Sequence, residues 1–140
     1  MRPIKFRGFT MGEEPRWIYG SLDFGEFFQG EYSRPAINYF DAEIGFDNRL
    51  VAEKSVGQFT GMEDGLGNEI YEGDIIETTI FGHTGLCVVE WDEDALVFVL
   101  RGRDGFIWRT LGELVNFCMV PCHVVGNMFE NKEMMEGGEG

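Results

Sequence analysis

The sequence has few basic residues, few cysteines and no long apolar run. Eleven Lys or Arg stand against 25 Asp or Glu, so the 140-residue chain carries a formal net charge of −14. A chain this acidic is repelled by phosphate backbones and anionic lipid, which argues against direct nucleic-acid binding. The acidity is typical of a well-solvated surface, and DNA mimicry is the alternative reading that the charge leaves open.

The chain contains three cysteines, an odd number. Small secreted domains are typically built on several disulfides, and this count does not suit such a framework. The N-terminus shows no apolar signal segment, and no window of about eighteen apolar residues predicts a membrane-spanning helix. We therefore expect a cytoplasmic protein that has no membrane association.

Hydrophobic residues are plentiful. They make up 44% of the chain, which includes thirteen Phe, three Trp and four Tyr. A disordered chain does not carry so many large apolar side chains. At this length the protein can form one domain or two small ones, and it can bury a core without disulfides, metals or other cofactors.

The second half of the chain shows four β-rich runs separated by four-residue turns. The runs are residues 74–81, 86–91, 96–101 and 106–110. Connections this short cannot join parallel neighbours, so the runs predict an antiparallel meander that closes with a final pair at 116–120 and 123–128. A small SH3-like barrel would bury one set of apolar residues. The expected set is Ile75, Val88, Trp91, Val97, Val99, Ile107 and Trp108.

The first half is less regular. Residues 4–9 and 16–24 alternate apolar and polar side chains and predict an antiparallel ribbon with Ile4 and Phe6 near a core. Residues 27–48 mix aromatics with Gly and Pro35, and they indicate only short strands. The fold class is thus mainly β, with an irregular β-rich region over 1–55, an SH3-like barrel over 56–130 and a flexible acidic tail over 131–140.

Residues 56–76, VGQFTGMEDGLGNEIYEGDII, contain five glycines. Gly and Asn tolerate positive φ, so residues 63–69 predict a tight connection, and Gly73 predicts a second reversal of the chain. Asp74 is placed to accept a hydrogen bond from the backbone where the next strand begins. Turn formation thus accounts for one set of residues. The set is Gly57, Gly61, Asp64, Gly67, Tyr71, Glu72, Gly73 and Asp74.

The same stretch, together with IKFRGF and RWIYG near the N-terminus and VVGNMFEN near the C-terminus, resembles the YopX family of phage, prophage and plasmid-borne proteins. These motifs bracket most of the chain, although residues 27–52 contribute nothing to the resemblance. The resemblance implies a mostly β protein with an SH3-like barrel. It implies no catalytic residue, ligand or activity.

Two spacings raise the question of a metal site. His83 and Cys87 form H-x3-C, while Cys118, Cys122 and His123 form C-x3-C-H, and residues four apart share one face of a strand. The C-x2-C knuckle typical of zinc sites is absent, and Cys in strands usually packs as a small buried hydrophobe. We therefore predict no bound metal.

No catalytic motif is present. The chain has no G-x-S-x-G, no P-loop and no dinucleotide fingerprint, and neither His has a recognisable Ser or Cys partner. Paired carboxylates at Asp64 and Asp74 have no fixed separation, and the acidic run Asp92 to Asp94 is typical of a solvated turn. A calcium loop fails because Leu66 stands where a ligand is required. We predict that the protein is not an enzyme.

A binding module is the positive alternative. Small barrels accept peptides or strand edges, and exposed aromatics favour such contacts. The candidate interaction residues are Trp17, Tyr19, Trp91 and Trp108, each of which can instead be a packing residue. We expect an accessory protein that binds an unidentified protein partner or forms a symmetric homo-oligomer. The rival hypothesis is a nucleic-acid-associated factor or DNA mimic.

Overall fold

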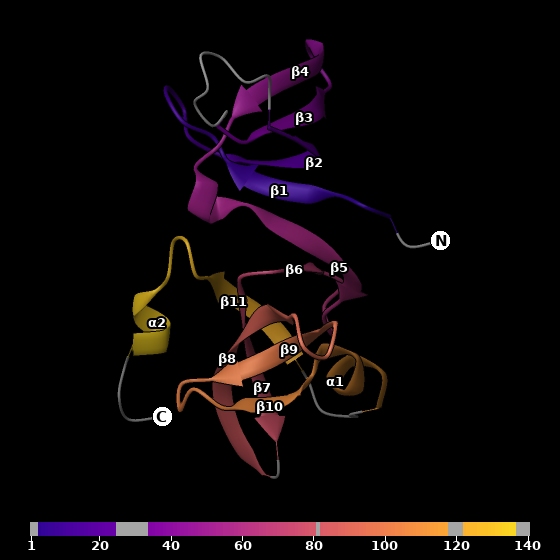
Figure 1. Ribbon diagram of the computed structural model, residues 1–140, viewed down its shortest axis with the longest axis vertical. Coiled ribbons are helices and arrows are strands. Elements are labelled where there is room, and N and C mark those ends of the chain that lie inside the picture. Colours follow the sequence, from indigo (N-terminus) through magenta and orange to yellow (C-terminus); the bar gives the residue numbers. More distant parts are fainter. Residues whose placement is uncertain (1–2, 25–33, 81, 118–121, 137–140) are drawn as a thin grey trace. The chain divides into compact units, whose positions relative to one another are not determined.

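The computed structural model describes residues 3–24, 34–80, 82–117 and 122–136. The chain divides into two compact units, Met1–Phe59 and Thr60–Gly140. The prediction of a mainly β protein is confirmed, because both units consist of antiparallel strands with short helices added (Figure 1). The strands form two sheets, and no closed barrel is found among the described residues. Within those residues no helix is long and apolar enough to cross a membrane.

The first unit is a sheet in which neighbouring strands run antiparallel in the order β4-β3-β2-β1-β5 (Figure 1). Strand β5 begins in this unit and ends in the second. A single 3₁₀ turn, Glu53–Ser55, precedes it. The strands are β1 Phe6–Phe9, β2 Trp17–Asp23, β3 Ala36–Asp41, β4 Gly45–Leu50 and β5 Gly57–Glu63.

Alternation along these strands selects the core of the first unit. Ile18, Ile37 and Tyr39 point to one face of the sheet and are buried together with Val51, while Phe6 packs at their edge. Successive side chains on a strand point to opposite faces, so the residues between them lie on the other face. The prediction that Ile4 lies near a core is wrong: its side chain is 74% exposed, because β1 begins two residues later at Phe6.

Two glycines allow this sheet to curl tightly. A Cβ added to Gly8 would lie 2.7 Å from three carbons of Val51, and a Cβ added to Gly20 would lie 1.8 Å from the Asn38 carbonyl oxygen. Val51 follows β4 directly and forms a bridge with Thr10, which follows β1. The end of β4 therefore returns to the end of β1, and the glycines are required where backbones meet most closely.

The second unit contains a five-stranded antiparallel sheet in the order β10-β9-β8-β7-β11. The short strand β6, Glu69–Tyr71, is the neighbour of β5. Helices α1, Leu111–Phe117, and α2, Glu133–Glu136, complete the unit. The sheet strands are β7 Asp74–Ile80, β8 His83–Asp92, β9 Val97–Gly102, β10 Ile107–Thr110 and β11 Cys122–Asn127.

The core of the second unit only partly matches the predicted set. Ile75, Val88 and Val99 are buried as expected. The prediction that Trp91, Val97 and Ile107 are buried is wrong, because these residues are 42%, 36% and 45% exposed. They lie within two residues of a strand end, where a sheet can no longer cover both faces. The observed core is instead the cluster Ile70, Ile76, Cys87, Val89, Leu100, Leu111, Leu114 and Cys122.

Helix α1 lies where the sequence predicted the start of a strand at residues 116–120, of which 118–120 fall outside the described residues. Thr110 caps the helix: its hydroxyl oxygen accepts the Glu113 backbone N–H at 3.1 Å and lies 3.0 Å from the Glu113 carboxylate. This T-x-x-E pairing is the usual N-terminal signal of a helix. Buried Leu111 and Leu114, three residues apart, anchor the helix on the core.

Candidate functional site

The glycine-rich stretch at residues 56–76 contains β5, a loop, β6, a turn and the start of β7. Asp64 organises the loop. Its Oδ1 accepts the backbone N–H groups of Leu66 and Asn68, both at 2.9 Å. Its Oδ2 accepts the Val124 backbone N–H from β11 at 2.9 Å and the Asn68 side-chain amide at 3.2 Å. One carboxylate thus closes the loop and ties it to the edge of the five-stranded sheet.

The environment of Asp64 favours its charged form. Burial of this side chain, which is 7% exposed, acts to raise its pKa, but the hydrogen bonds from Val124, Asn68 and Leu66 act in the opposite direction and prevail. The pKa is therefore lowered from the ordinary value of 3.8. A carboxylate that accepts several N–H groups and stays ionised is a poor general acid, and here it serves as a structural acceptor.

A second buried carboxylate holds the turn between β6 and β7. Asp74 is 1% exposed, and its Oδ2 accepts the Tyr71 backbone N–H at 2.7 Å. Gly73 adopts φ +93°, donates its N–H to the Val89 carbonyl and accepts the Met128 N–H, both at 2.8 Å. The remaining turn residue, Glu72, is half-buried. Both carboxylates named in the sequence are thus bonded to the backbone nearby.

The glycines of this stretch have different backbone conformations. Gly61 and Gly67 have φ of +88° and +84°. Gly57 is buried opposite Arg7 in the pairing of β1 with β5. Tyr71 is 2% exposed and its hydroxyl donates to Glu69 at 3.2 Å. The stretch forms a set of turns and pairings, and backbone N–H groups such as those of Gly65, Gly67 and Gly73 donate within the fold.

The described cysteines and histidines lie on two strands, β8 and β11. Cys87 and Cys122 are buried in the same core cluster, whereas His83 is exposed at the start of β8. Burial, with a smaller contribution from Cys122, raises the pKa of Cys87 to about 12, so its thiol is protonated at neutral pH. Cys118 lies outside the described residues. Within the described part of the chain no three His, Cys, Asp or Glu side chains gather as metal ligands.

Trp108, one of the predicted interaction residues, packs into the fold. The register of β10 against β9 shifts between Ile107 and Arg109, which is a bulge at Trp108. The indole lies over Gly102, where an added Cβ would approach its ring to 2.2 Å, and over Gly85 at 3.0 Å. Its Nε1 donates to the Asp104 carboxylate at 3.2 Å. The ring covers the edge of the second unit's core.

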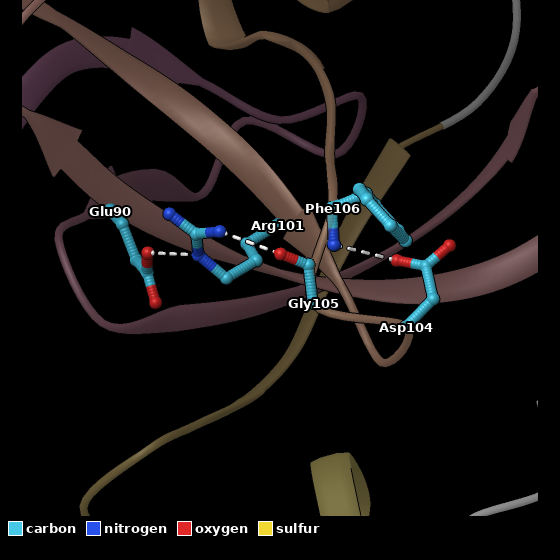
Figure 2. A network of polar contacts seen from close by, with 5 residues as sticks. All are labelled: Glu90, Arg101, Asp104, Gly105 and Phe106. Atoms are coloured by element: carbon cyan, nitrogen blue, oxygen red, sulfur yellow. Dashed lines mark hydrogen bonds and ion pairs between the residues drawn. The ribbon is translucent and has the colours of Figure 1, made fainter.

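The turn between β9 and β10 is fixed by polar contacts (Figure 2). The Arg101 guanidinium bonds to Glu90 on β8 at 2.6 Å and donates to the Gly105 carbonyl at 2.6 Å. The hydrogen bond that Arg101 donates to Glu90, and then the charge of that carboxylate, raise the pKa of Arg101. Asp104 accepts the Phe106 backbone N–H at 2.9 Å. The Arg101 side chain therefore stabilises this hairpin and its pairing with β8.

Trp91 and the acidic hairpin beside it are open to solvent. Trp91 makes an edge-to-face contact with Phe98 at 5.0 Å between ring centroids. Asp92 follows it, and its side chain accepts the Asp94 backbone N–H at 3.1 Å while its carbonyl accepts Leu96. These contacts make a hairpin tip, in which Asp is a usual turn residue.

The first unit presents its aromatics differently. Trp17 is half-buried, with the Arg7 guanidinium 4.7 Å from its ring centroid and the Phe9 ring edge-on at 5.3 Å. Tyr19, two residues further along β2, is 49% exposed on the same face. Sequence reasoning missed Phe40 and Phe46, which pair across β3 and β4 at 5.3 Å. They are 65% and 87% exposed on the face opposite the core.

The charge of the chain is divided unevenly. Residues 1–59 contain seven Lys or Arg and nine Asp or Glu, a net charge of −2, whereas residues 60–140 contain four and sixteen, a net charge of −12. The exposed aromatics of β2, β3 and β4 therefore belong to a nearly neutral unit. The acidity that dominates the whole sequence belongs to the other.

Comparison with known proteins agrees with the sequence motifs. The family model described as YopX protein matches residues 5–136, which is nearly the whole chain, so the chain belongs to the YopX family. Its fold is similar to the crystal structure of protein EF1440 from Enterococcus faecalis, with a TM-score of 0.53, 16% sequence identity and coverage of 97% of this chain and 100% of that one. Among curated proteins, none matches this chain.

Proposed function

We propose that this YopX-family protein is a non-enzymatic accessory protein of a phage or prophage, and that it acts in the cytoplasm through protein contacts made by its first unit. The observation that carries the proposal is the aromatic surface on β2, β3 and β4. Tyr19, Phe40 and Phe46 expose about half, two thirds and most of their side chains on one sheet face. Large aromatics gathered on a surface are typical of protein interaction sites.

The remaining aromatic candidates support this choice of unit. Trp108 is used in packing against Gly102 and Gly85. Trp91 is exposed, but the hairpin beside it carries Asp92, Glu93 and Asp94. Charged side chains are depleted at the centres of interfaces, so Trp91 is the weaker candidate.

We assign the glycine-rich stretch to the fold rather than to a ligand. Asp64 and Asp74 each accept hydrogen bonds from the nearby backbone, and three of its glycines have positive φ. The division into residues 1–55, 56–130 and 131–140, and an SH3-like class for the middle region, stay predictions. The residues assigned to the fold are Gly57, Gly61, Asp64, Gly67, Tyr71, Glu72, Gly73 and Asp74.

A DNA mimic is the second candidate, and the −12 charge of residues 60–140 favours it. Such a protein would compete with DNA for a basic partner and would be displaced by salt. Direct binding of nucleic acid is not supported. Sites that stack single-stranded nucleic acid combine aromatic side chains with a basic groove. On the side of β1 to β4 that carries Tyr19, the one basic side chain is Arg7, and it is buried against Trp17.

Partner capture from bacterial cells tests the proposal. The parent protein, the double variant Phe40→Ser with Phe46→Ser, and Phe106→Ser would each be crosslinked in cells and analysed by mass spectrometry. Phe106 is a matched control, because it is 73% exposed in the second unit. We expect the parent and Phe106→Ser to capture the same proteins, this chain included, and the double variant to lose them. Equal capture by all three variants would contradict the proposal.

A further inference from the structure

The exposed face of β2, β3 and β4, here called the aromatic face, carries large apolar side chains and little charge. It comprises Tyr19 and Ser21 of β2, Asn38 and Phe40 of β3, and Phe46, Asn48 and Leu50 of β4. In these strands Asp23, at the end of β2, is the one charged residue that alternation places on this face. On the neighbouring strand β1, Arg7 lies beside Tyr19 but is buried against Trp17. A basic or acidic partner would find little complementary charge here, whereas a second copy of the same face would meet little repulsion.

Two polar side chains at the centre of the aromatic face are paired with each other. The Asn48 side-chain amide donates to the Asn38 side-chain oxygen at 2.6 Å. Burying a polar group costs most when it lacks a hydrogen-bond partner, so this pair can be covered at reduced cost. The centre of the face is therefore suited to burial against another protein.

The area fits a weak dimer. The exposed fractions of Tyr19, Phe40 and Phe46, at 49%, 65% and 87%, together correspond to about two whole aromatic side chains. That is roughly 300–500 Å² on one copy, and twice as much when two copies pack together. Specific interfaces bury about 1,200–2,000 Å² in total, and Leu50 and the neighbouring polar residues bring this face to the lower end of that range. Such an interface predicts reversible association.

The edge of β4 favours packing through the face over addition of a strand. Val51 donates its N–H to the Pro35 carbonyl on the β3 side. Because hydrogen-bonding residues alternate along an antiparallel strand, the backbone N–H and carbonyl groups of residues 46, 48 and 50 point away from β3, toward the outer edge. The Leu50 carbonyl already accepts the Met11 N–H, and the Asn48 N–H already donates to the Asp47 carboxylate at 2.9 Å. These two bonds use part of the outer edge and so disfavour addition of a strand of another chain at those positions.

We propose that the aromatic face binds a second copy of this chain, giving a two-fold symmetric dimer centred on Phe40 and Phe46. An isologous contact needs a self-complementary surface, which a nearly uncharged face with a paired amide centre provides. This inference rests on the proposed function, because it names the partner of the same surface. Ring packing between copies would replace water over both Phe pairs.

Sedimentation velocity between about 1 and 200 μM protein tests the dimer. We expect the parent protein and Phe106→Ser to show a concentration-dependent shift from monomer to dimer. Phe40→Ser with Phe46→Ser should raise the dissociation constant at least about tenfold, as truncation of central aromatics does. Circular dichroism of the double variant checks that it is folded. A parent that stays monomeric at the highest concentration, or a dimer that the double variant leaves intact, overturns the inference.

A photo-crosslinking residue at position 46 separates the inference from the proposed function. In the purified protein, irradiation should give a covalent dimer whose crosslinked peptides come from residues 36–50 of the second copy. Irradiation in bacterial cells should give the same product. Crosslinks in cells to a different protein, without the homodimer, would refute the inference and keep the proposed function. Absence of any crosslinked protein would refute both.

Discussion

In the first unit Phe40 and Phe46 lie open on the sheet surface, whereas in the second unit Trp108 lies against two glycines and is held by Asp104. The first unit has a net charge of −2 and the second −12. Phe40 and Phe46 are thus available for contact in the unit of low charge, whereas Trp108 is used for packing in the unit of high charge. The second unit also exposes Trp91 and Phe106, but these stand in hairpins that carry Asp side chains. Desolvating an aromatic surface is easiest away from charged neighbours, which favours the first unit as the contact surface.

The two units also differ in what fixes the backbone. In the first, Gly8 and Gly20 allow strands to approach closely. In the second, buried carboxylates accept backbone N–H groups at the turns. The first unit should therefore be sensitive to added volume at these two glycines, and the second should lose the stabilisation by Asp64 in acid. Substitutions confined to one unit test this difference.

Gly20→Ala should have the largest effect. The new Cβ would lie 1.8 Å from the Asn38 carbonyl oxygen, and a backbone atom cannot move aside as a flexible side chain can. We expect a loss of at least about 3 kcal/mol in the free energy of unfolding, at the upper end for overpacking. Hydrogen exchange detected by mass spectrometry should show faster exchange in β2 and β3. Gly65→Ala, whose nearest contact would be an ordinary 3.4 Å, is the control and should behave like the parent.

Gly102→Ala should cause the second-largest loss of stability. Its Cβ would approach the Trp108 ring to 2.2 Å, and the indole must leave its position over the core edge. A loss of about 2 kcal/mol is expected, since a side chain can yield where a backbone cannot. Urea unfolding would measure it, and Trp108 fluorescence should shift toward that of an exposed indole. Unchanged fluorescence together with unchanged stability would mean that Trp108 does not pack on Gly102.

Elements that have a strong local sequence pattern could be predicted. The strands of the second unit were found because apolar alternation is interrupted by Gly and Asp in turns, and β7 to β10 lie close to the predicted runs. The signal for α1 was present in Thr110 and Glu113 but was missed, because seven residues are too few for a clear helical period. The strands predicted on either side favoured a strand at residues 116–120, where the helix ends instead.

Other features depend on contacts that no local pattern encodes. The β3–β4 hairpin was indistinct because Phe40 and Phe46 place apolar residues on the outer face as well as the inner one, which removes the alternation. The bond from Val124 to Asp64 joins residues sixty positions apart. The packing of Trp108 depends on a bulge in the register of β10. Each needs the tertiary structure before it can be recognised.

Asp64→Asn should weaken the second unit and flatten its response to acid. The amide keeps one acceptor oxygen but places an NH₂ group against donors, so we expect a loss of roughly 1 to 2 kcal/mol near neutral pH. The pKa of Asp64 is lowered in the folded protein, so the unfolded state binds the proton more readily. The stabilisation is therefore complete above the ordinary value of 3.8 and is lost as pH falls through the lower, folded pKa.

Urea midpoints of the parent and Asp64→Asn measured from pH 2 to 7 would check this. The difference between the two proteins should be constant near neutral pH and should shrink in the most acidic samples. A difference that stays the same down to pH 2 would show that the charge of Asp64 does not stabilise the loop.

Phe46→Ser should have the smallest effect on stability, although it is expected to have a large effect on association. Its side chain is 87% exposed and contacts Phe40 edge-on. An exposed aromatic pair adds little to folding, so the free energy of unfolding should change by about 0.5 kcal/mol or less. The free energy of unfolding should be measured at low micromolar protein concentration. There a weak dimer is dissociated, and association does not add to the apparent stability. Trp108→Ser provides the contrast, since it removes a packed ring from the second unit. If Phe46→Ser cost as much as Trp108→Ser in such a measurement, Phe46 would be part of a core, and the contrast between the exposed Phe46 and the packed Trp108 would not hold.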